Sequence, residues 1–171
     1  MPGVGKSTIG RQLSRRFGVP FLDADGWIEA RIGCPIRDFF EIEGEARFRE
    51  IETQVLNDLL RESDGVIATG GGAVLADANR AALRRCARCV YLKSPPDDLF
   101  RRLRHDTKRP LLQVADPLAR LRDLFAQRDP LYTETAHITV ETGPAALPEL
   151  VDRIVRELER MGPTAGNAAR S

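Results

Sequence analysis

The sequence predicts an α/β fold in which helices cover both faces of a parallel sheet. Two observations indicate this class. Short apolar runs typical of buried strands alternate with helical patterns along nearly all of the 171 residues. Small or polar residues follow several of these runs, at the strand ends where parallel sheets bind ligands. The length suits one domain, which we expect at residues 1–161, followed by a disordered tail at 162–171.

In the first half of the chain, the elements are predicted from apolar spacing and from glycines. Ile9, Leu13 and Phe17 share one helical face, and Gly18 ends that helix. Gly44 interrupts a long helical pattern. In order, we expect a helix at 6–18, a buried strand at 19–25, helices at 26–33 and 35–63, and a strand at 65–75 that runs into three glycines.

The second half of the chain continues the alternation. Asp77 is expected to cap a helix, prolines stand at the start of the next helix, and Pro130 is expected to end a third. The stretch at 106–116 is polar and then turn-like, and we interpret it as a mobile loop. In order, we expect a helix at 77–86, a strand at 88–94, helices at 95–105 and 117–130, a strand at 137–142 and a helix at 147–161.

Composition and charge argue against several classes of protein. The formal net charge is +1 and the arginines alternate with acids, so the sequence lacks the basic field typical of nucleic-acid binding. No apolar run approaches the roughly 18 residues of a membrane span, and a cytoplasmic setting is the default expectation. Cys86 and Cys89 form a lone C-x-x-C. Because His105 and His137 lack zinc-ligand spacing, we interpret the two cysteines as structural.

The chain begins with "MPGVGKST", which contains most of a phosphate-binding loop. Small residues let backbone N–H groups surround phosphate oxygens, and the helix that follows adds the partial positive charge of its N-terminus. Lys6 is expected to reach the β- and γ-phosphates of a nucleotide, and Ser7 to bind Mg²⁺. The loop residues are Gly3, Val4, Gly5, Lys6, Ser7 and Thr8. A chance turn is the alternative, which the helical pattern after the loop disfavours.

Two further groups of residues follow predicted strands. Asp23 and Asp25 end one strand, where one carboxylate could hold Mg²⁺ through water and the other could accept a proton from a hydroxyl. A turn with a helix cap is the alternative for these acids. Gly70, Gly71 and Gly72 end another strand. Three adjacent glycines indicate the close approach of another molecule, or else a flexible connection.

Three arginines are candidates for binding a substrate, and each has an ordinary alternative. Arg49 could pair with a carboxylate through its planar guanidinium, but Glu45 lies four residues earlier and could hold it on the helix surface. Arg109 lies in the expected mobile loop and could close over a transferring phosphoryl group, or be a solvated charge. Arg128 lies near a helix end, where a cation is favoured in any case.

In combination, these stretches resemble the shikimate kinase family, whose members transfer the γ-phosphoryl group of ATP to the 3-hydroxyl of shikimate. The resemblance runs from "GVGKSTIGRQLS" to "HITVETG" and rests on the order of "GKST", "DAD", "FEIEGEARFREIE", "ATGGGAV", "RPLL" and "QRDPLY". It implies a three-layer P-loop kinase fold with a parallel sheet in the order 2-3-1-4-5. It also implies ATP and shikimate as ligands, Mg²⁺ as the cofactor, and a place in chorismate and aromatic amino acid biosynthesis. We expect a monomer.

The resemblance implies a role for each matching residue. Lys6, Asp25 and Arg109 would be catalytic, with Asp25 as the base and Arg109 as the lid residue on the γ-phosphate. Arg49 and Arg128 would hold the carboxylate of shikimate. The resemblance also implies that Ser7 and Asp23 hold the metal, and that the nucleotide is bound by Arg102 and the loop residues 3–8. Shikimate would be bound by Asp25, Gly70, Gly71 and Gly72, with Phe40 and Phe48 as an apolar wall beside it.

The sequence departs from the family pattern in two places. The stretch "ETGPAALP" after the last strand lacks the arginine that members often place near the adenine. The first glycine of the loop motif would fall one position before Met1, and the strand that should feed the loop is not in the sequence. We therefore expect Met1 to be an internal residue of the loop, and a sheet of four strands with a gap or a forced closure at its centre. Expressed alone, the chain is expected to be poorly folded and inactive, because strand edges at the centre would lose their partners.

Two other functions remain open. Another small-molecule kinase, such as a gluconate kinase, would share the phosphate loop but would not need the pair Arg49 and Arg128. A kinase-like domain that only binds its ligand, or an inactive paralogue, is the other alternative. The presence of Lys6, Asp25 and Arg109 argues against it.

Overall fold

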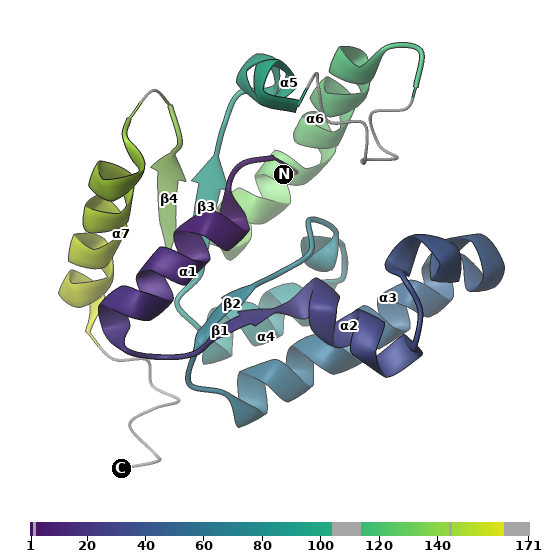
Figure 1. Ribbon diagram of the computed structural model, residues 1–171, viewed down its shortest axis with the longest axis horizontal. Helices are drawn as coiled ribbons and strands as arrows, with labels where there is room; N and C mark the ends of the chain where they lie inside the picture. The colour runs from purple at the N-terminus through teal and green to yellow at the C-terminus, as the bar shows by residue number, and fades with distance from the viewer. Residues whose placement is uncertain (2, 104–113, 144, 163–171) are drawn as a thin grey trace.

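The computed structural model describes residues 1, 3–103, 114–143 and 145–162. Their elements alternate between helix and strand, as expected (Figure 1). In chain order they are α1 (Lys6–Phe17), β1 (Phe21–Asp23), α2 (Ala24–Ile32), α3 (Ile36–Glu62), β2 (Val66–Ala68), the 3-10 helix η1 (Ala73–Leu75), α4 (Asp77–Cys86), β3 (Val90–Lys93), α5 (Pro96–Leu103), α6 (Pro117–Thr135), β4 (Ile138–Glu141) and α7 (Leu147–Met161).

The four strands of the described residues form two parallel pairs. β1 pairs with β2, with Leu22 opposite Ile67, and β3 pairs with β4, with Tyr91 opposite Thr139. Figure 1 shows the two pairs apart, with α1 running between them. α1 contacts α7, whereas α4 contacts α3 and α6, so separate groups of helices cover the strands. The predicted α/β class and the expected gap in a four-stranded sheet are therefore confirmed, and the strands have not closed the gap.

A cavity of about 620 Å³ separates β2 from β3, and we call it the central cavity. Its lining includes Ile67 of β2, Leu92 of β3, and Ile9 and Leu13 of α1. This volume is far larger than the voids of a close-packed interior. Because α1 contacts both β2 and α7, helix packing and not strand pairing connects the two halves of the sheet across the central cavity.

Two hydrophobic clusters hold the elements in place. The larger one joins α1, α5, α6 and α7 to β3 and β4, and includes the fully buried Leu99 and Ile154. The smaller one joins α2 to α3 through Ile28 and Val55, with Leu22 of β1 packed against it. Burying one such side chain contributes about 1.5–3 kcal/mol. Each strand pair therefore has its own apolar support.

One expected helix boundary and one expected helix cap are wrong. α6 continues through Pro130 to Thr135, although a proline inside a helix costs about 3 kcal/mol or more. Contacts made after the proline offset this cost: the Tyr132 hydroxyl donates a hydrogen bond to the carbonyl oxygen of Gly71. Asp77 is also not a cap, because α4 is preceded by Ala76 and the Asp77 carboxylate pairs with Arg80 instead.

The predictions for Gly18 and Gly44 are confirmed. Gly18 ends α1 in the left-handed conformation, with φ of 65°. Gly44 has φ of 79° and ψ of 173°, which breaks the helical geometry inside α3. The expected tail beyond residue 162 and the loop residues 104–113 lie outside the described residues.

Nothing in the described part of the chain is a helix long and apolar enough to cross a membrane. Cys34, Cys86 and Cys89 are free thiols. Burial raises the pKa of the Cys89 thiol to about 11, so this thiol stays protonated near neutral pH. A protonated thiol is a poor nucleophile, which supports the structural interpretation of this cysteine.

The two parallel pairs predict which backbone amides face the central cavity. Hydrogen-bonding directions alternate along a strand. Cys89 and Lys93 accept bonds from β4 and the segment next to it, so the Leu92 N–H points away from β4 and into the central cavity. We expect the Leu92 amide to exchange with solvent at least about ten times faster than the adjacent Tyr91 amide, after correction for intrinsic rates. Hydrogen exchange followed by NMR measures both. Equal protection of the two amides would show that another group pairs with this edge of β3.

Candidate active site

The loop before α1 has the geometry of a phosphate site. Gly3 and Gly5 have φ of 74° and 93°, a conformation that favours glycine, and Gly5 precedes the first turn of α1. That turn contains no acidic residue, so its N–H groups keep their attraction for an anion. The Lys6 ammonium donates to the carbonyl oxygen of Met1 at 3.2 Å, which folds its side chain back over the loop. The described residues of the loop therefore have the conformation that the predicted phosphate loop requires.

The two acids after β1 have different positions. Asp23 ends β1 and caps α2, because its carboxylate accepts the Asp25 N–H at 3.2 Å. Asp25 lies in the first turn of α2. Burial, followed by the charge of Asp23, raises the pKa of Asp25, while Lys6 and Arg49 act in the opposite direction. Asp25 is an exposed residue whose carboxylate lies close enough to the phosphate-loop lysine and to one of the candidate arginines to feel their charges.

The three glycines after β2 form a turn in which each residue contacts a different part of the site. A Cβ atom at Gly70 would lie 2.9 Å from Asp25 Oδ1, and one at Gly71 would lie 3.3 Å from Arg128 Nη1. At Gly72 it would lie 2.5 Å from Arg49 Cζ. Contacts this short exclude a side chain at Gly70 and Gly72 unless their neighbours move. The turn, which we call the glycine turn (residues 70–72), therefore brings Asp25, Arg49 and Arg128 together.

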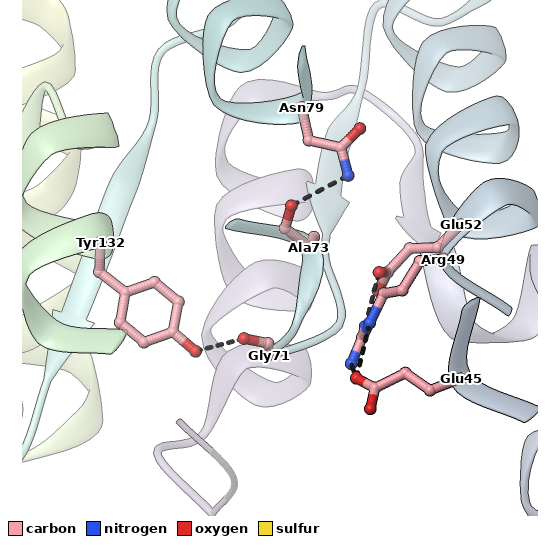
Figure 2. A network of polar contacts seen from close by, with 7 residues as sticks. All are labelled: Glu45, Arg49, Glu52, Gly71, Ala73, Asn79 and Tyr132. Carbon is pink, nitrogen blue, oxygen red and sulfur yellow. Dashed lines mark hydrogen bonds and ion pairs between the residues drawn. The ribbon is translucent and has the colours of Figure 1, made fainter. Parts of the chain in front are cut away.

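Arg49 reaches the glycine turn from α3. Its guanidinium pairs with Glu52 at 2.7 Å and with Glu45 at 3.0 Å (Figure 2). The same group lies over the ring of Phe48, with Cζ 5.2 Å from the ring centre, and Phe48 packs against Phe40 at 4.4 Å between centroids. The ordinary alternative for Arg49 is therefore observed, because it pairs with Glu45, and its guanidinium also faces the glycine turn.

Arg128 reaches the glycine turn from α6. Its Nε is buried and has no hydrogen-bond partner among the described residues. A buried donor without a partner is costly, and a ligand oxygen would remove that cost. Arg49 and Arg128 approach neighbouring glycines of one turn. The two guanidinium groups thus offer the paired, planar donors that suit a carboxylate.

Two residues of the site were missed from the sequence. The side chain of Glu52 is only 4% exposed, pairs with Arg49 and approaches Gly70. Burial raises its pKa, and the Arg49 hydrogen bond opposes that change. Tyr132 donates to the Gly71 carbonyl at 2.6 Å (Figure 2). Their spacing was the available signal: Glu52 follows Arg49 by three residues and Tyr132 follows Arg128 by four, so each pair shares a helix face.

Of the remaining predicted site residues, Arg102 is among the described residues and Arg109 is not. Arg102 donates to the carbonyl oxygen of Thr142 at 2.6 Å, just beyond β4. Its neighbour Leu103 lies against Gly3 of the phosphate loop, since a Cβ atom there would meet the leucine side chain. Leu103 thus joins α5 to the phosphate loop, and a contact of Arg102 with a nucleotide stays a prediction. Arg109 lies outside the described residues.

Comparison with known proteins gives a consistent result. The family described as "Shikimate kinase" matches residues 2–159. The chain is 48% identical over 169 residues to a shikimate kinase of Ralstonia nicotianae, covering 99% of this chain and 89% of the relative. The solved structure of shikimate kinase from Acinetobacter baumannii in complex with shikimate has a TM-score of 0.85 and 45% identity, covering 91% of this chain and 87% of that one. Shikimate kinase from Bacteroides thetaiotaomicron also has a TM-score of 0.85, with 33% identity and coverage of 92% and 94%.

The match extends from the phosphate loop through the glycine turn to α6, and so includes every described residue of the candidate site. Sequence, fold and site geometry agree, and the chain belongs to the shikimate kinase family.

Proposed function

We propose that the protein transfers the γ-phosphoryl group of ATP to the 3-hydroxyl of shikimate, giving shikimate 3-phosphate for chorismate and aromatic amino acid biosynthesis. One observation carries the proposal: the glycine turn brings Asp25, Arg49 and Arg128 into one site, next to Lys6 of the phosphate loop. This arrangement offers two guanidinium groups for a carboxylate, a carboxylate for a hydroxyl and a cation for phosphate. Shikimate has the carboxylate and hydroxyl groups that this site would recognise. The similar kinase from Acinetobacter baumannii was solved in complex with shikimate, which supports the same substrate here.

In this mechanism the site residues bind, orient and accept a proton. Arg49 and Arg128 hold the substrate carboxylate, which directs the ring hydroxyls toward Asp25. Asp25 takes the proton of the substrate 3-hydroxyl while the oxygen of that hydroxyl bonds to the γ-phosphorus. At the same time, the bond from the γ-phosphorus to the bridging oxygen of the β-phosphate breaks. Lys6 stabilises the charge on the phosphate oxygens, since phosphoryl transfer depends mainly on positioning and electrostatics. Arg109 is proposed to contact the γ-phosphate, and Arg102 to lie near the nucleotide.

The donor groups near the phosphate loop fit Mg²⁺. Ser7 supplies a hydroxyl oxygen and Asp23 a carboxylate, and Mg²⁺ is normally held by one or two carboxylates together with phosphate oxygens. Asp23 and Lys6 both act electrostatically on Asp25, so each of them lies near that carboxylate. Mg²⁺ bound there would neutralise negative charge on the phosphates. The monomeric state and the cytoplasmic setting stay predictions.

The function is tested by ADP release with shikimate as acceptor and with gluconate as the control. The assay uses the chain as printed, and also a version with about ten to fifteen added residues before Met1, enough for a strand and its lead-in. We expect shikimate-dependent turnover in at least one of the two versions, with a product whose mass is that of shikimate 3-phosphate, and the variants described below are made in that version. Failure of both versions with shikimate, or turnover with gluconate instead, would overturn the proposal.

Replacing either arginine of the carboxylate site by lysine should mainly weaken shikimate binding. Lysine keeps the charge but loses the planar pair of donors. For Arg49→Lys and for Arg128→Lys, we expect KM for shikimate to rise about tenfold or more, because a hydrogen bond to a charged group contributes about 1.5–3 kcal/mol. KM for ATP should change little. Steady-state kinetics in both substrates measures this difference. Arg37→Lys is the control, because Arg37 pairs with Glu41 on the exposed surface of α3. Equal changes in both KM values would mean that these arginines are structural or serve the nucleotide.

A further inference from the structure

The hydroxyl of Tyr132 connects two parts of the site that come from distant segments of the chain. It donates a hydrogen bond to the Gly71 carbonyl at 2.6 Å, across 61 positions in sequence (Figure 2). Burial raises the pKa of Tyr132, and the charge of Arg128 beside it acts in the opposite direction. A phenol can donate one bond and accept others, so a single hydroxyl can serve both partners. A Cβ atom at Gly71 would lie 3.3 Å from Arg128 Nη1 and 3.4 Å from the Tyr132 hydroxyl, which shows that all three groups meet at one place.

Contacts with β3 fix the position of Tyr132. Its ring packs on the ring of Tyr91 with the centroids 4.9 Å apart. The Tyr91 hydroxyl donates to Asp129 at 2.8 Å, and the Lys93 ammonium pairs with the same carboxylate at 2.9 Å. Asp129 directly follows Arg128 in α6. The Lys93 ammonium and the Tyr91 ring therefore hold α6 against β3 at two positions, Asp129 and Tyr132, that both lie within the turn after Arg128.

We propose that Tyr132 is a positioning residue, which holds Arg128 against the glycine turn and thereby sets the affinity for the carboxylate of the substrate. This inference rests on the proposed function. Arginine has several freely rotating bonds, and immobilising such a side chain on binding lowers affinity by about twofold to tenfold. A guanidinium already held at the glycine turn avoids much of this cost. Because Tyr132 acts through Arg128, its hydroxyl should affect shikimate binding and not the chemical step.

The hydroxyl has a second neighbour that gives an alternative role. The amino group of Met1 lies 3.5 Å from it, at the start of the phosphate loop. If the hydroxyl mainly supported the phosphate loop through Met1, its loss would raise KM for ATP as well. The two KM values therefore separate positioning of Arg128 from support of the phosphate loop.

The test compares Tyr132→Phe with Tyr91→Phe, which removes a neighbouring buried hydroxyl whose partner Asp129 is still held by Lys93. For Tyr132→Phe we expect KM for shikimate to rise about tenfold, with kcat and KM for ATP within about twofold of the parent. Tyr91→Phe should leave KM for shikimate within about twofold. Thermal unfolding of each variant shows whether the fold is kept.

A double-mutant cycle with Arg128→Lys shows whether the two residues act together. If Tyr132 works through Arg128, adding Tyr132→Phe to Arg128→Lys should raise KM for shikimate less than about twofold further. A tenfold rise in both backgrounds, an unchanged KM in Tyr132→Phe, an equal effect of Tyr91→Phe, or a rise in KM for ATP would each overturn the inference. A parent without shikimate-dependent turnover would overturn the proposed function instead.

Discussion

Lys6→Ala should lower kcat about a hundredfold or more, by analogy with the loss of one preorganised electrostatic donor from an active site. Lys6 is the first residue of α1 and follows Gly5, whose left-handed conformation turns the chain into the helix. Its ammonium lies over the phosphate loop, 3.2 Å from the Met1 carbonyl oxygen, and its charge acts on Asp25. An ammonium at this place can stabilise the negative charge that shifts between phosphate oxygens during transfer, whereas the methyl side chain of alanine cannot.

The control for Lys6→Ala is Arg16→Ala, which also removes a cation from α1. Arg16 lies near the other end of the helix, where its side chain is 62% exposed and its ion pair with Asp152 spans 3.7 Å. An exposed pair of this kind contributes about 0–1 kcal/mol, so turnover should be unchanged. Both variants are compared with the parent in the shikimate-dependent ADP assay. Equal turnover of Lys6→Ala and the parent would remove Lys6 from the mechanism.

Much of the site was predictable because a parallel sheet collects residues that are far apart in sequence. The carboxyl ends of parallel strands meet at one edge of the sheet, so Asp23 after one strand and Gly70 after the next had to lie near each other. The phosphate loop was predictable for a similar reason, because its glycines and the following helix are local in sequence. Gly3 and Gly5 adopt the left-handed conformation that such a loop requires.

The contacts of α3 and α6 could not be predicted from local sequence. Glu52 is in the stretch "RFREIE", whose alternating charges are typical of a solvated helix face, yet it is buried beside Arg49. Its burial depends on the rotation of α3 against the glycine turn. Pro130 was expected to end α6 because local propensity disfavours proline inside a helix. The bond from Tyr132 to Gly71 shows why the helix continues, and this bond joins residues 61 positions apart.

Asp25→Asn should lower kcat by about 10²–10⁴-fold, the usual contribution of a general base. Asparagine keeps the size of the side chain and the hydrogen-bonding carbonyl, but it cannot accept the proton of the 3-hydroxyl. Glu29→Gln is the matched control: it makes the same change of carboxylate to amide one turn later in α2, and its remaining oxygen can still accept the Ile36 N–H. We expect Glu29→Gln to stay within about twofold of the parent. Steady-state kinetics at saturating ATP separates the two possible roles of Asp25. If KM for shikimate rises while kcat stays within about threefold, Asp25 binds the substrate hydroxyls and another group takes the proton.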